Sequence, residues 1–274
     1  MTAISNELRQ LAADTHVIIL AAGLGTRLKE NTQATPKCLV PVSGQPILER
    51  MLENLAALGV RRASIVVGYL DQAIRQFVGA WLQEQGQGLE VDFVLNERYA
   101  QSGSVLSLEL ALREADAECE RQHLLLIEGD VVTDRRLLQR LLEQGVQGAE
   151  AATMLAPYEP ALNGTFATVD GGVVSAWLHE SVREPGFELQ RSFKTVNLSF
   201  VRRGTPRQRL LARVSGEIAR AGVKAPLEYA MHALVLEGLQ IRAVLTDGLP
   251  WFEVDTPEDL AIANAMFPPL AVAA

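Results

Sequence analysis

The stretch THVIILAAGLGTRLKENTQATPK (15–37) places an apolar run of strand length directly before a glycine-containing turn and a basic segment. VIIL (17–20) is short and wholly apolar, which favours a buried strand. The two glycines of GLGTR (23–27) let the backbone approach a ligand, and successive N–H groups in such a turn form a concave site for an anion. Its threonine adds a hydroxyl, and its arginine can hold a phosphate through two parallel hydrogen bonds. The stretch therefore predicts a strand followed by a phosphate-binding turn.

A lysine extends this basic segment. Lys37 follows Arg27 by ten residues, and its mobile ammonium suits a triphosphate tail. A glycine-x-glycine turn alone is weak support, because an ordinary strand–turn–helix connection can contain one. Two common nucleotide motifs are excluded: Leu28 stands where the dinucleotide fingerprint needs its third glycine, and the G-K-[ST] of a P-loop is absent.

Strands and helices are predicted to alternate after this turn. The first half contains the strands 17–20, 63–69, 91–96 and 123–130 and the helices 46–58, 71–85, 107–120 and 134–144. Such alternation indicates a parallel sheet that is covered by helices on both faces.

The second half is less regular. It contains predicted strands at 150–156, 194–203 and 241–246, a hairpin at 167–178, a helix-rich stretch at 206–237 and a strand–turn–helix at 251–267. We expect an α/β fold: a single three-layer domain over 15–267 with a mostly parallel mixed sheet, preceded by a helical extension at 1–14. Its halves, 15–148 and 149–267, are expected to bind the nucleotide and the acceptor.

The composition excludes several classes of protein. The chain has 274 residues, of which 48% are hydrophobic and 21% charged, an ordinary globular mix. Its net charge of −8 argues against a nucleic-acid partner. No apolar run is long enough to span a membrane, and the first residues do not resemble a secretion signal. Its two cysteines, Cys38 and Cys119, form neither a disulfide framework nor a metal-ligand cluster, so we expect a cytoplasmic protein.

Acidic side chains stand at two predicted strand ends. Asp130 ends LLLIEGD (124–130), and Glu253 and Asp255 lie two residues apart in WFEVDTPEDL (251–260), so they face the same side of an extended segment. Mg²⁺ prefers oxygen ligands, and ligands bind at the carboxyl ends of strands in open α/β sheets. The alternative is that Asp255 or Thr256 caps the following helix and that Asp130 closes a turn. Glu128 is a neighbour that would act behind Asp130.

The segments LAAGLGTRL (20–28) and TPKCLVPVSGQPILE (35–49) together resemble the N-terminal signature of nucleotidyltransferases of the sugar-nucleotide pyrophosphorylase kind. The resemblance extends over roughly 15–265 and implies a Rossmann-like fold of the nucleotide-diphospho-sugar transferase type. It implies that an aspartate and an acidic x-Asp pair bind Mg²⁺, matching Asp130, Glu253 and Asp255. It also implies that the loop, its arginine and the later lysine hold a nucleoside triphosphate through Leu20, Ala21, Ala22, Gly23, Gly25, Thr26, Arg27 and Lys37.

Other segments resemble bacterial cytidylyltransferases that act on phosphocholine or 2-aminoethylphosphonate. They are NERYAQSGSVLSLELAL (96–112), IEGDVVTD (127–134), KTVNLSFV (194–201) and WFEVDTPEDL (251–260). The first departs from the usual pattern, which has a polar Thr/Asn run and an aromatic residue before Ser-Leu. Here Ser102, Gly103 and Ser104 stand at the place where a pyrimidine edge would be read.

The acceptor side is predicted from the second half. Lys194 would neutralise the attacking phosphate or phosphonate, although a solvated lysine is the alternative. Asn197, three residues on, would face the opposite side of a regular strand. An amino or choline head group needs acidic or aromatic partners. Glu228 and Trp251 are preferred for this role, and Tyr158, Trp177 and Tyr229 are further candidates.

The sequence thus predicts a Mg²⁺-dependent cytidylyltransferase that joins CTP to a small phosphate or phosphonate acceptor and releases pyrophosphate. Arg27, Lys37 and Lys194 would be its catalytic residues. Two alternatives stay open: a sugar-1-phosphate nucleotidyltransferase that uses UTP or dTTP, and a non-catalytic nucleotide-binding regulatory module. The oligomeric state is left open.

Overall fold

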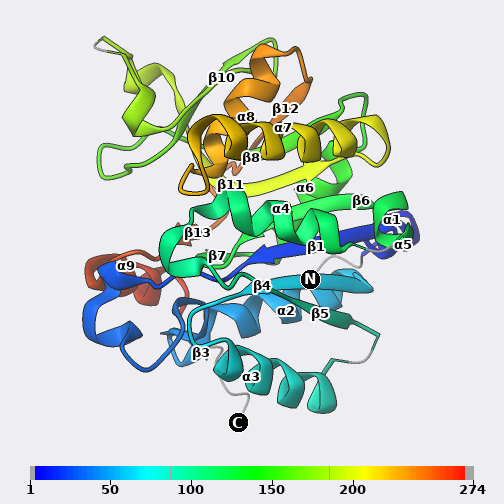
Figure 1. The fold of residues 1–274 in the computed structure, drawn as a ribbon, viewed down its shortest axis with the longest axis vertical. Coiled ribbons are helices and arrows are strands. Elements are labelled where there is room, and N and C mark those ends of the chain that lie inside the picture. Colours follow the sequence, from blue (N-terminus) through cyan, green and yellow to red (C-terminus); the bar gives the residue numbers. More distant parts are fainter. Residues whose placement is uncertain (1–3, 87, 116, 185, 269–274) are drawn as a thin grey trace.

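The computed structural model describes residues 4–86, 88–115, 117–184 and 186–268 (Figure 1). The helices are α1 Asn6–Ala13, α2 Ile47–Leu58, α3 Asp71–Glu84, α4 Ser104–Glu114, α5 Ala117–Arg121, α6 Arg135–Gly145, α7 Thr205–Ala221, α8 Leu227–Leu236 and α9 Pro257–Met266. The strands are β1 Thr15–Leu20, β2 Pro41–Val42, β3 Gln45–Pro46, β4 Arg62–Val67, β5 Glu90–Leu95, β6 His123–Glu128, β7 Val131–Thr133, β8 Ala151–Pro157, β9 Phe166–Asp170, β10 Val173–Leu178, β11 Phe193–Val201, β12 Ile241–Leu245 and β13 Trp251–Glu253.

Among the described residues, nine strands form one sheet in the order β5-β4-β1-β6-β11-β8-β12-β10-β9. β5, β4, β1 and β6 are parallel to one another, as are β8 and β12. β11 runs antiparallel to both β6 and β8. The chain leaves β1 toward β4 on one side and returns to β6 on the other, so β1 and β6 flank the topological switch point. Open α/β sheets bind ligands at this point, outside the carboxyl ends of the strands.

Helices cover both faces of the sheet (Figure 1). One buried hydrophobic cluster joins α1, α2, α3 and α6 to one face, and a second joins α4, α7 and α8 to the other. The predicted α/β three-layer fold with a mixed sheet is therefore confirmed.

Two predicted helices differ in detail. The predicted helix 107–120 begins earlier, at Ser104, and breaks after Glu114, because Ala115 has the extended backbone of φ −59° and ψ 128°. The helical extension predicted at 1–14 appears as α1. Its Leu8 and Ala12 are buried in the hydrophobic cluster shared with α2, α3 and α6, so α1 packs as part of the core.

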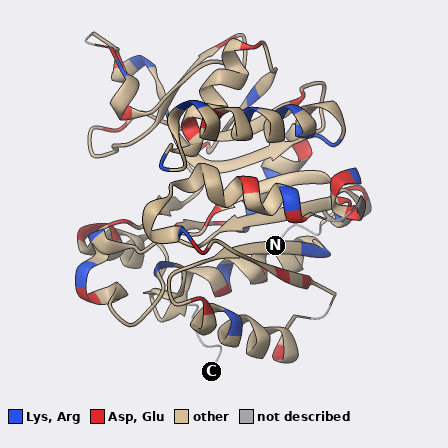
Figure 2. Ribbon diagram, viewed as in Figure 1, with Lys and Arg blue, Asp and Glu red and all other residues tan. Residues whose placement is uncertain are grey.

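Charged residues of both signs are interspersed along the helices, strands and loops (Figure 2). His16 and His123 are both buried: His16 bonds Ser64 at 2.8 Å, and the ring of His123 stacks on Phe200. Across the described part of the chain, each helix is too short or too polar to cross a membrane.

Candidate active site

The glycine loop leaves β1 and folds back over the segment that carries Lys37. Gly25 has a φ of +63°, a conformation that glycine adopts without strain. A Cβ there would also lie only 3.0 Å from the Cβ of Lys37 and 3.1 Å from the Cγ2 of Thr32. The hydroxyl of Thr32 donates to the carbonyl of Gly25 at 2.9 Å and closes the loop. Gly25 is therefore required both for the turn and for the close approach of Lys37.

Lys37 connects the two predicted metal-binding aspartates. Its ammonium donates to Asp130 Oδ2 and to Asp255 Oδ1, each at 2.5 Å. Burial opposes the charge on Lys37, but the two carboxylates outweigh it, so the pKa of Lys37 is raised. Arg27 also bonds Asp255 Oδ1, at 2.8 Å, while its side chain stays 68% exposed. The fold thus joins the glycine loop, β6 and the segment after β13 in one charged cluster.

The alternative role of Asp255 as a helix cap is not realised. The N-cap of α9 is Thr256, whose hydroxyl accepts from the backbone N–H of Asp259 at 3.1 Å. The carboxylate of Asp259 accepts in return from the N–H of Thr256 at 2.8 Å, which completes a capping box. The carboxylate of Asp255 is therefore left for Lys37 and Arg27.

A second acidic group lies beside this cluster. Glu128, Asp130 and Glu253 each offer a carboxylate oxygen, and these three atoms lie within 4.8 Å of one another. Asp130 Oδ1 is buried without a hydrogen-bond partner among the described residues. An unpartnered oxygen in a cluster of three carboxylates fits the oxygen-rich site that Mg²⁺ prefers. Glu128, expected to act behind Asp130, belongs to the cluster itself.

The crowding of these carboxylates affects their ionisation. The pKa of Glu128 is raised well above its usual value, first by burial and then by repulsion from Glu228, Asp130 and Glu253. The pKa of Glu253 is also raised, chiefly by burial, although Lys194 opposes the shift. A cation that bound here would lower the electrostatic cost of ionising both groups.

Lys194 and Asn197 face the same acidic group. The buried ammonium of Lys194 donates to Glu253 Oε2 at 3.0 Å and to the carbonyl of Thr195 at 2.9 Å. The expectation that Asn197 points to the opposite side is wrong, because its amide donates to Glu253 Oε1 at 3.2 Å. The register of β11 against β8 shifts between Thr195 and Ser199, and Asn197 has a φ of +60°. This irregularity breaks the alternation on which the expectation depended.

Two adjoining cavities of about 160 and 390 Å³ open at the switch point, and both are lined by Leu20, Gly23, Tyr99, Ser102 and Asp130. The larger is also bordered by Ala21, Gly25, Thr26, Arg27, Lys37 and Asp255, and the smaller by Ala22, Asn96, Gly103, Ser104, Ser107 and Glu128. Most residues predicted to hold the nucleotide therefore line one continuous region.

The residues predicted to contact the base also form contacts within the protein. Ser102 accepts from the amide of Asn96 at 3.0 Å. Ser104 accepts from the N–H of Leu227, at the start of α8, at 2.9 Å. A Cβ on Gly103 would lie 2.4 Å from the carbonyl of Ala225. Gly103 and Ser104 thus fix the start of α4 against the loop before α8.

A further cavity, of about 20 Å³, is lined by Leu126, Glu128, Trp177, Asn197, Ser199, Leu227, Glu228 and Met231. Glu228 and Trp177, both head-group candidates, are brought together here. Trp251 does not line this cavity. It pairs with Thr133 at the end of β13 that lies away from Glu253, and it is buried in the hydrophobic cluster that joins α1, α2, α3 and α6 to the sheet. The structure assigns Trp251 to the core, which corrects its predicted role at the acceptor.

Sequence reasoning missed Asn96, Tyr99 and Ser107, which line the smaller cavity at the switch point. Asn96 follows β5 directly, its amide donates to Ser102 and Ser107, and its side-chain oxygen accepts from the N–H of Arg98. The rule that ligands bind beyond the carboxyl ends of parallel strands, applied to this strand as well, would have indicated Asn96.

The chain is similar to known nucleotidyltransferases. It is 32% identical over 260 residues to the CMP-5'-(3-aminopropyl)phosphonate synthase of Streptomyces rubellomurinus, covering 94% of this chain and 40% of that protein. It is 36% identical over 129 residues to the 2-aminoethylphosphonate cytidylyltransferase of Lancefieldella rimae, covering 47% of this chain and 48% of that protein. These alignments thus span less than half the length of either curated relative.

Solved structures confirm the fold. That of the CTP:phosphocholine cytidylyltransferase from Streptococcus pneumoniae superimposes with a TM-score of 0.69 at 21% identity, covering 92% of this chain and 98% of that one. The family described as "MobA-like NTP transferase domain" matches residues 17–184, more than half of the chain, from within β1 to beyond β10. The chain therefore belongs to the MobA-like NTP transferase family.

Proposed function

We propose that this chain is a Mg²⁺-dependent cytidylyltransferase that transfers CMP from CTP to a small phosphonate or phosphate bearing a primary ammonium group. The observation that carries the proposal is the switch-point cluster, in which Lys37 and Arg27 meet Asp130 and Asp255 beside Glu253 and Lys194. The side of the cluster with Lys37 and Arg27 suits a triphosphate, and the side with Lys194 suits a second anion. The names of the relatives support the choice of CTP and of an aminoalkylphosphonate.

On the nucleotide side, the glycine loop and Arg27 would hold the phosphates, and Lys37 would turn from the aspartates toward them. A flexible four-carbon stem makes such a turn possible, and a compact ammonium serves as a point charge. The smaller cavity offers Ser102 and Asn96 to the base, while the ring of Tyr99 lines it. These polar groups are suited to a pyrimidine edge.

The metal would be held by Asp130, Glu253 and Asp255, with Glu128 in the same cluster. When bound, Mg²⁺ neutralises phosphate charge and orients the transferring group. Lys194 binds Glu253 and would keep that carboxylate turned toward the cluster. An ammonium has three donors, and Lys194 uses two of them, for Glu253 and Thr195. Its third donor would bind the acceptor anion.

The acceptor's head group would enter the small cavity beside Glu228. Its volume of about 20 Å³ is close to the space needed by one water molecule, so a primary ammonium fits it better than a trimethylammonium group. The carboxylates of Glu128 and Glu228 repel each other there, and Lys194 offsets this repulsion only in part, so a further positive charge would stabilise the pair. An ammonium group would supply that charge, with the ring of Trp177 as a wall.

In the reaction, an acceptor oxygen attacks the α-phosphorus of CTP and a new P–O bond forms. The bond from the α-phosphorus to the bridging oxygen breaks, and pyrophosphate leaves with that electron pair. The protein holds two anions in line and stabilises the charge on the transferring group. Arg27, Lys37 and Lys194 are the cations of this chain that would do so.

A screen of pyrophosphate release tests the proposal. CTP, UTP, dTTP, ATP and GTP would each be paired with 2-aminoethylphosphonate, phosphocholine, phosphoethanolamine and glucose 1-phosphate. We expect CTP with 2-aminoethylphosphonate or phosphoethanolamine to react fastest, and Asp130→Asn to remove the signal. Faster reaction of UTP or dTTP with glucose 1-phosphate would establish the sugar alternative. No release with any pair would favour a non-catalytic nucleotide-binding module.

A further inference from the structure

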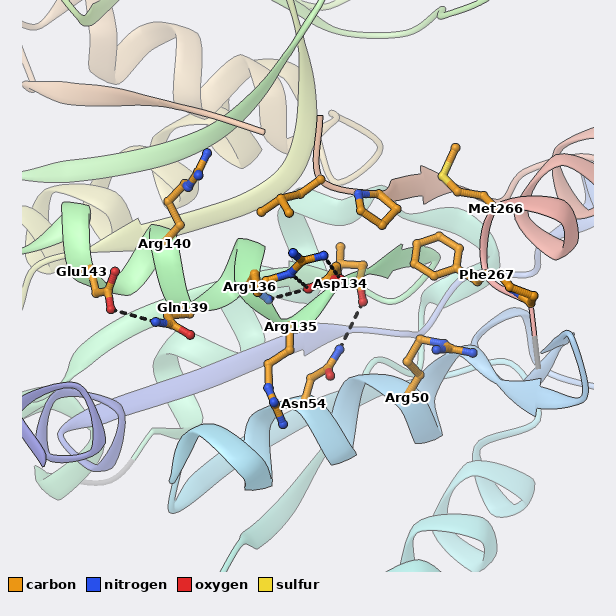
Figure 3. Close-up of a pocket in the computed structure, with 14 residues that line it drawn as sticks. Arg50, Asn54, Asp134, Arg135, Arg136, Gln139, Arg140, Glu143, Met266 and Phe267 are labelled. Atoms are coloured by element: carbon orange, nitrogen blue, oxygen red, sulfur yellow. Dashed lines mark hydrogen bonds and ion pairs between the residues drawn. The ribbon is translucent and has the colours of Figure 1, made fainter. Parts of the chain in front are cut away.

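A large cavity of about 890 Å³ lies away from the candidate active site, between α2, the start of α6 and the end of α9 (Figure 3). It shares no lining residue with the switch-point cavities. β7 and β13 run between the two regions: Asp130 and Glu253 lie at one end of this ribbon, and Thr133 and Pro250 at the other. Its volume is within the range of small-molecule sites, about 300–1,000 Å³.

Four arginines line this cavity, and two of them have no acidic partner within the described ranges. Arg136 is paired with Asp134 at 2.8 Å, and Arg140 with Asp247 at 2.6 Å. Arg50, from α2, and Arg135, from α6, form no ion pair with the described residues, and both side chains are seen in the cavity in Figure 3.

The environment of Arg50 leaves its charge poorly compensated. Its Nε is buried and has no hydrogen-bond partner among the described residues. Burial lowers the pKa of its guanidinium, although Glu53 and Glu49 act against this shift. A buried donor of this kind is stabilised when an anion accepts from it. Glu143, which also lines the cavity, is bonded to Gln139 at 3.0 Å.

Apolar residues also line the cavity. Met266 ends α9 and Phe267 follows it, while Leu249 and Pro250 precede β13. The guanidinium of Arg50 lies 5.4 Å from the ring centroid of Phe267, so charge and aromatic surface adjoin (Figure 3). A ligand that filled the cavity would therefore meet cationic groups and apolar surface side by side.

We propose that this cavity binds a phosphorylated small molecule with a compact apolar or planar body. A phosphate monoester carries a charge of about −1.5 to −2 at neutral pH, which suits two unpaired guanidinium groups better than a monocarboxylate does. Arginine–phosphate contacts are commonly bidentate, with two parallel hydrogen bonds. The body of the ligand would pack against Phe267 and Met266. This site is independent of the transfer reaction proposed above.

Phenyl phosphate is a suitable probe, and the methyl group of Met266 is a suitable reporter. With ¹³C-methyl-labelled methionine, the Met266 signal would be assigned from its loss in Met266→Leu. We expect phenyl phosphate to shift this signal saturably, benzoate to bind at least tenfold more weakly, and inorganic phosphate to compete.

Three variants identify the site. Arg50→Gln/Arg135→Gln should weaken phenyl phosphate binding at least tenfold while the signals of Met51 and Met154 report an intact core. Arg136→Gln, on the same helix but paired with Asp134, should bind nearly as the parent does. Arg27→Gln, in the candidate active site, should leave the Met266 titration unchanged.

Three results would overturn the proposal. They are a Met266 signal that does not respond to saturating phenyl phosphate, a response that survives in the double variant, and a response lost in Arg27→Gln. A Met266 shift that follows protein concentration and is insensitive to the probe would instead identify the cavity as an interface between copies of the chain.

Discussion

At the scale of single residues, the candidate site is held together by ion pairs and hydrogen bonds between two lysines, an asparagine and the acidic side chains. Lys37 bridges Asp130 and Asp255, while Lys194 and Asn197 divide the two oxygens of Glu253. Each carboxylate that could bind a metal is therefore already oriented by a cation or an amide. Preorganised groups of this kind lose little energy to rearrangement when the substrate's charge develops.

The first prediction concerns Asp130. Asp130→Asn keeps the shape of the side chain but removes the charge from the oxygen that is buried without a partner. We expect kcat/KM for CTP to fall by about 10²–10³, as when one preorganised stabiliser of charge is lost. Steady-state kinetics across a Mg²⁺ titration measure this. A variant within threefold of the parent at saturating Mg²⁺ would rule out Asp130 as a metal ligand.

The second prediction concerns the backbone at Asn197, whose φ is +60°. Alanine in this left-handed conformation costs about 1–2 kcal/mol, whereas glycine adopts it freely. Asn197→Ala should therefore unfold at lower urea concentration than Asn197→Gly. Both variants lack the amide that bonds Glu253, so both should lose turnover to a similar extent. Equal stability of the two variants would contradict the importance of this backbone conformation.

Residue-level predictions from the sequence succeeded where the strand was regular. Asp130 follows the carboxyl end of β6, where the rule for open sheets places ligands, and Asp255 meets it because β13 pairs antiparallel with β7, which brings the end of β13 beside the start of β7. The prediction that Asn197 lies on the opposite side of the strand from Lys194 was wrong. A shift of register within a strand cannot be read from an alternating sequence pattern. Trp251 was misassigned because nearness to Glu253 in sequence does not tell which end of the strand approaches the site.

At the scale of elements, the capped start of α9 holds Asp255 in place. Thr256 caps this helix through Asp259, and Asp255 directly precedes it. Thr256→Ala should lower the free energy of unfolding by about 0.5–2 kcal/mol, the usual cost of losing such a cap. Because the cap fixes the chain next to Asp255, the variant should also show a raised Mg²⁺ requirement.

Thr256→Ser is the matched control, since serine keeps the hydroxyl that accepts from Asp259. Chemical denaturation measures the stability, and a Mg²⁺ titration of activity measures the requirement. If Thr256→Ala lost stability but kept the parental Mg²⁺ dependence, the cap would serve only the helix.

The elements of the first half were predictable because each strand is a short apolar run and each helix has apolar residues at helical spacing. The second half was harder to predict. β11 joins the two halves of the sheet by antiparallel pairing with β6 and β8. Such long-range pairing depends on tertiary packing, which periodicity does not encode.

At the scale of the whole molecule, the acidic cluster makes stability depend on pH. The pKa of Glu128 in the folded protein is raised from 4.5, so the native state binds a proton that the unfolded chain has released. Its contribution to stability is complete below about pH 4.5 and is lost as the pH rises through the raised native value.

Glu128→Gln removes this ionisation. The stability of the parent relative to Glu128→Gln should therefore fall as the pH rises above 4.5 in the absence of Mg²⁺ and substrates. Urea unfolding at several pH values measures the difference. A constant difference across this range would show that Glu128 ionises at its ordinary pKa, contrary to the crowded cluster described here.

We propose that CMP transfer takes place at the switch-point cluster. The most direct measurement is ³¹P NMR of the protein with CTP, Mg²⁺ and 2-aminoethylphosphonate. We predict equal amounts of pyrophosphate and of a new product with a phosphonate–phosphate anhydride signal, and neither with Asp130→Asn. Pyrophosphate accompanied by free CMP alone, or an unchanged CTP spectrum, would contradict the transfer of CMP to the acceptor.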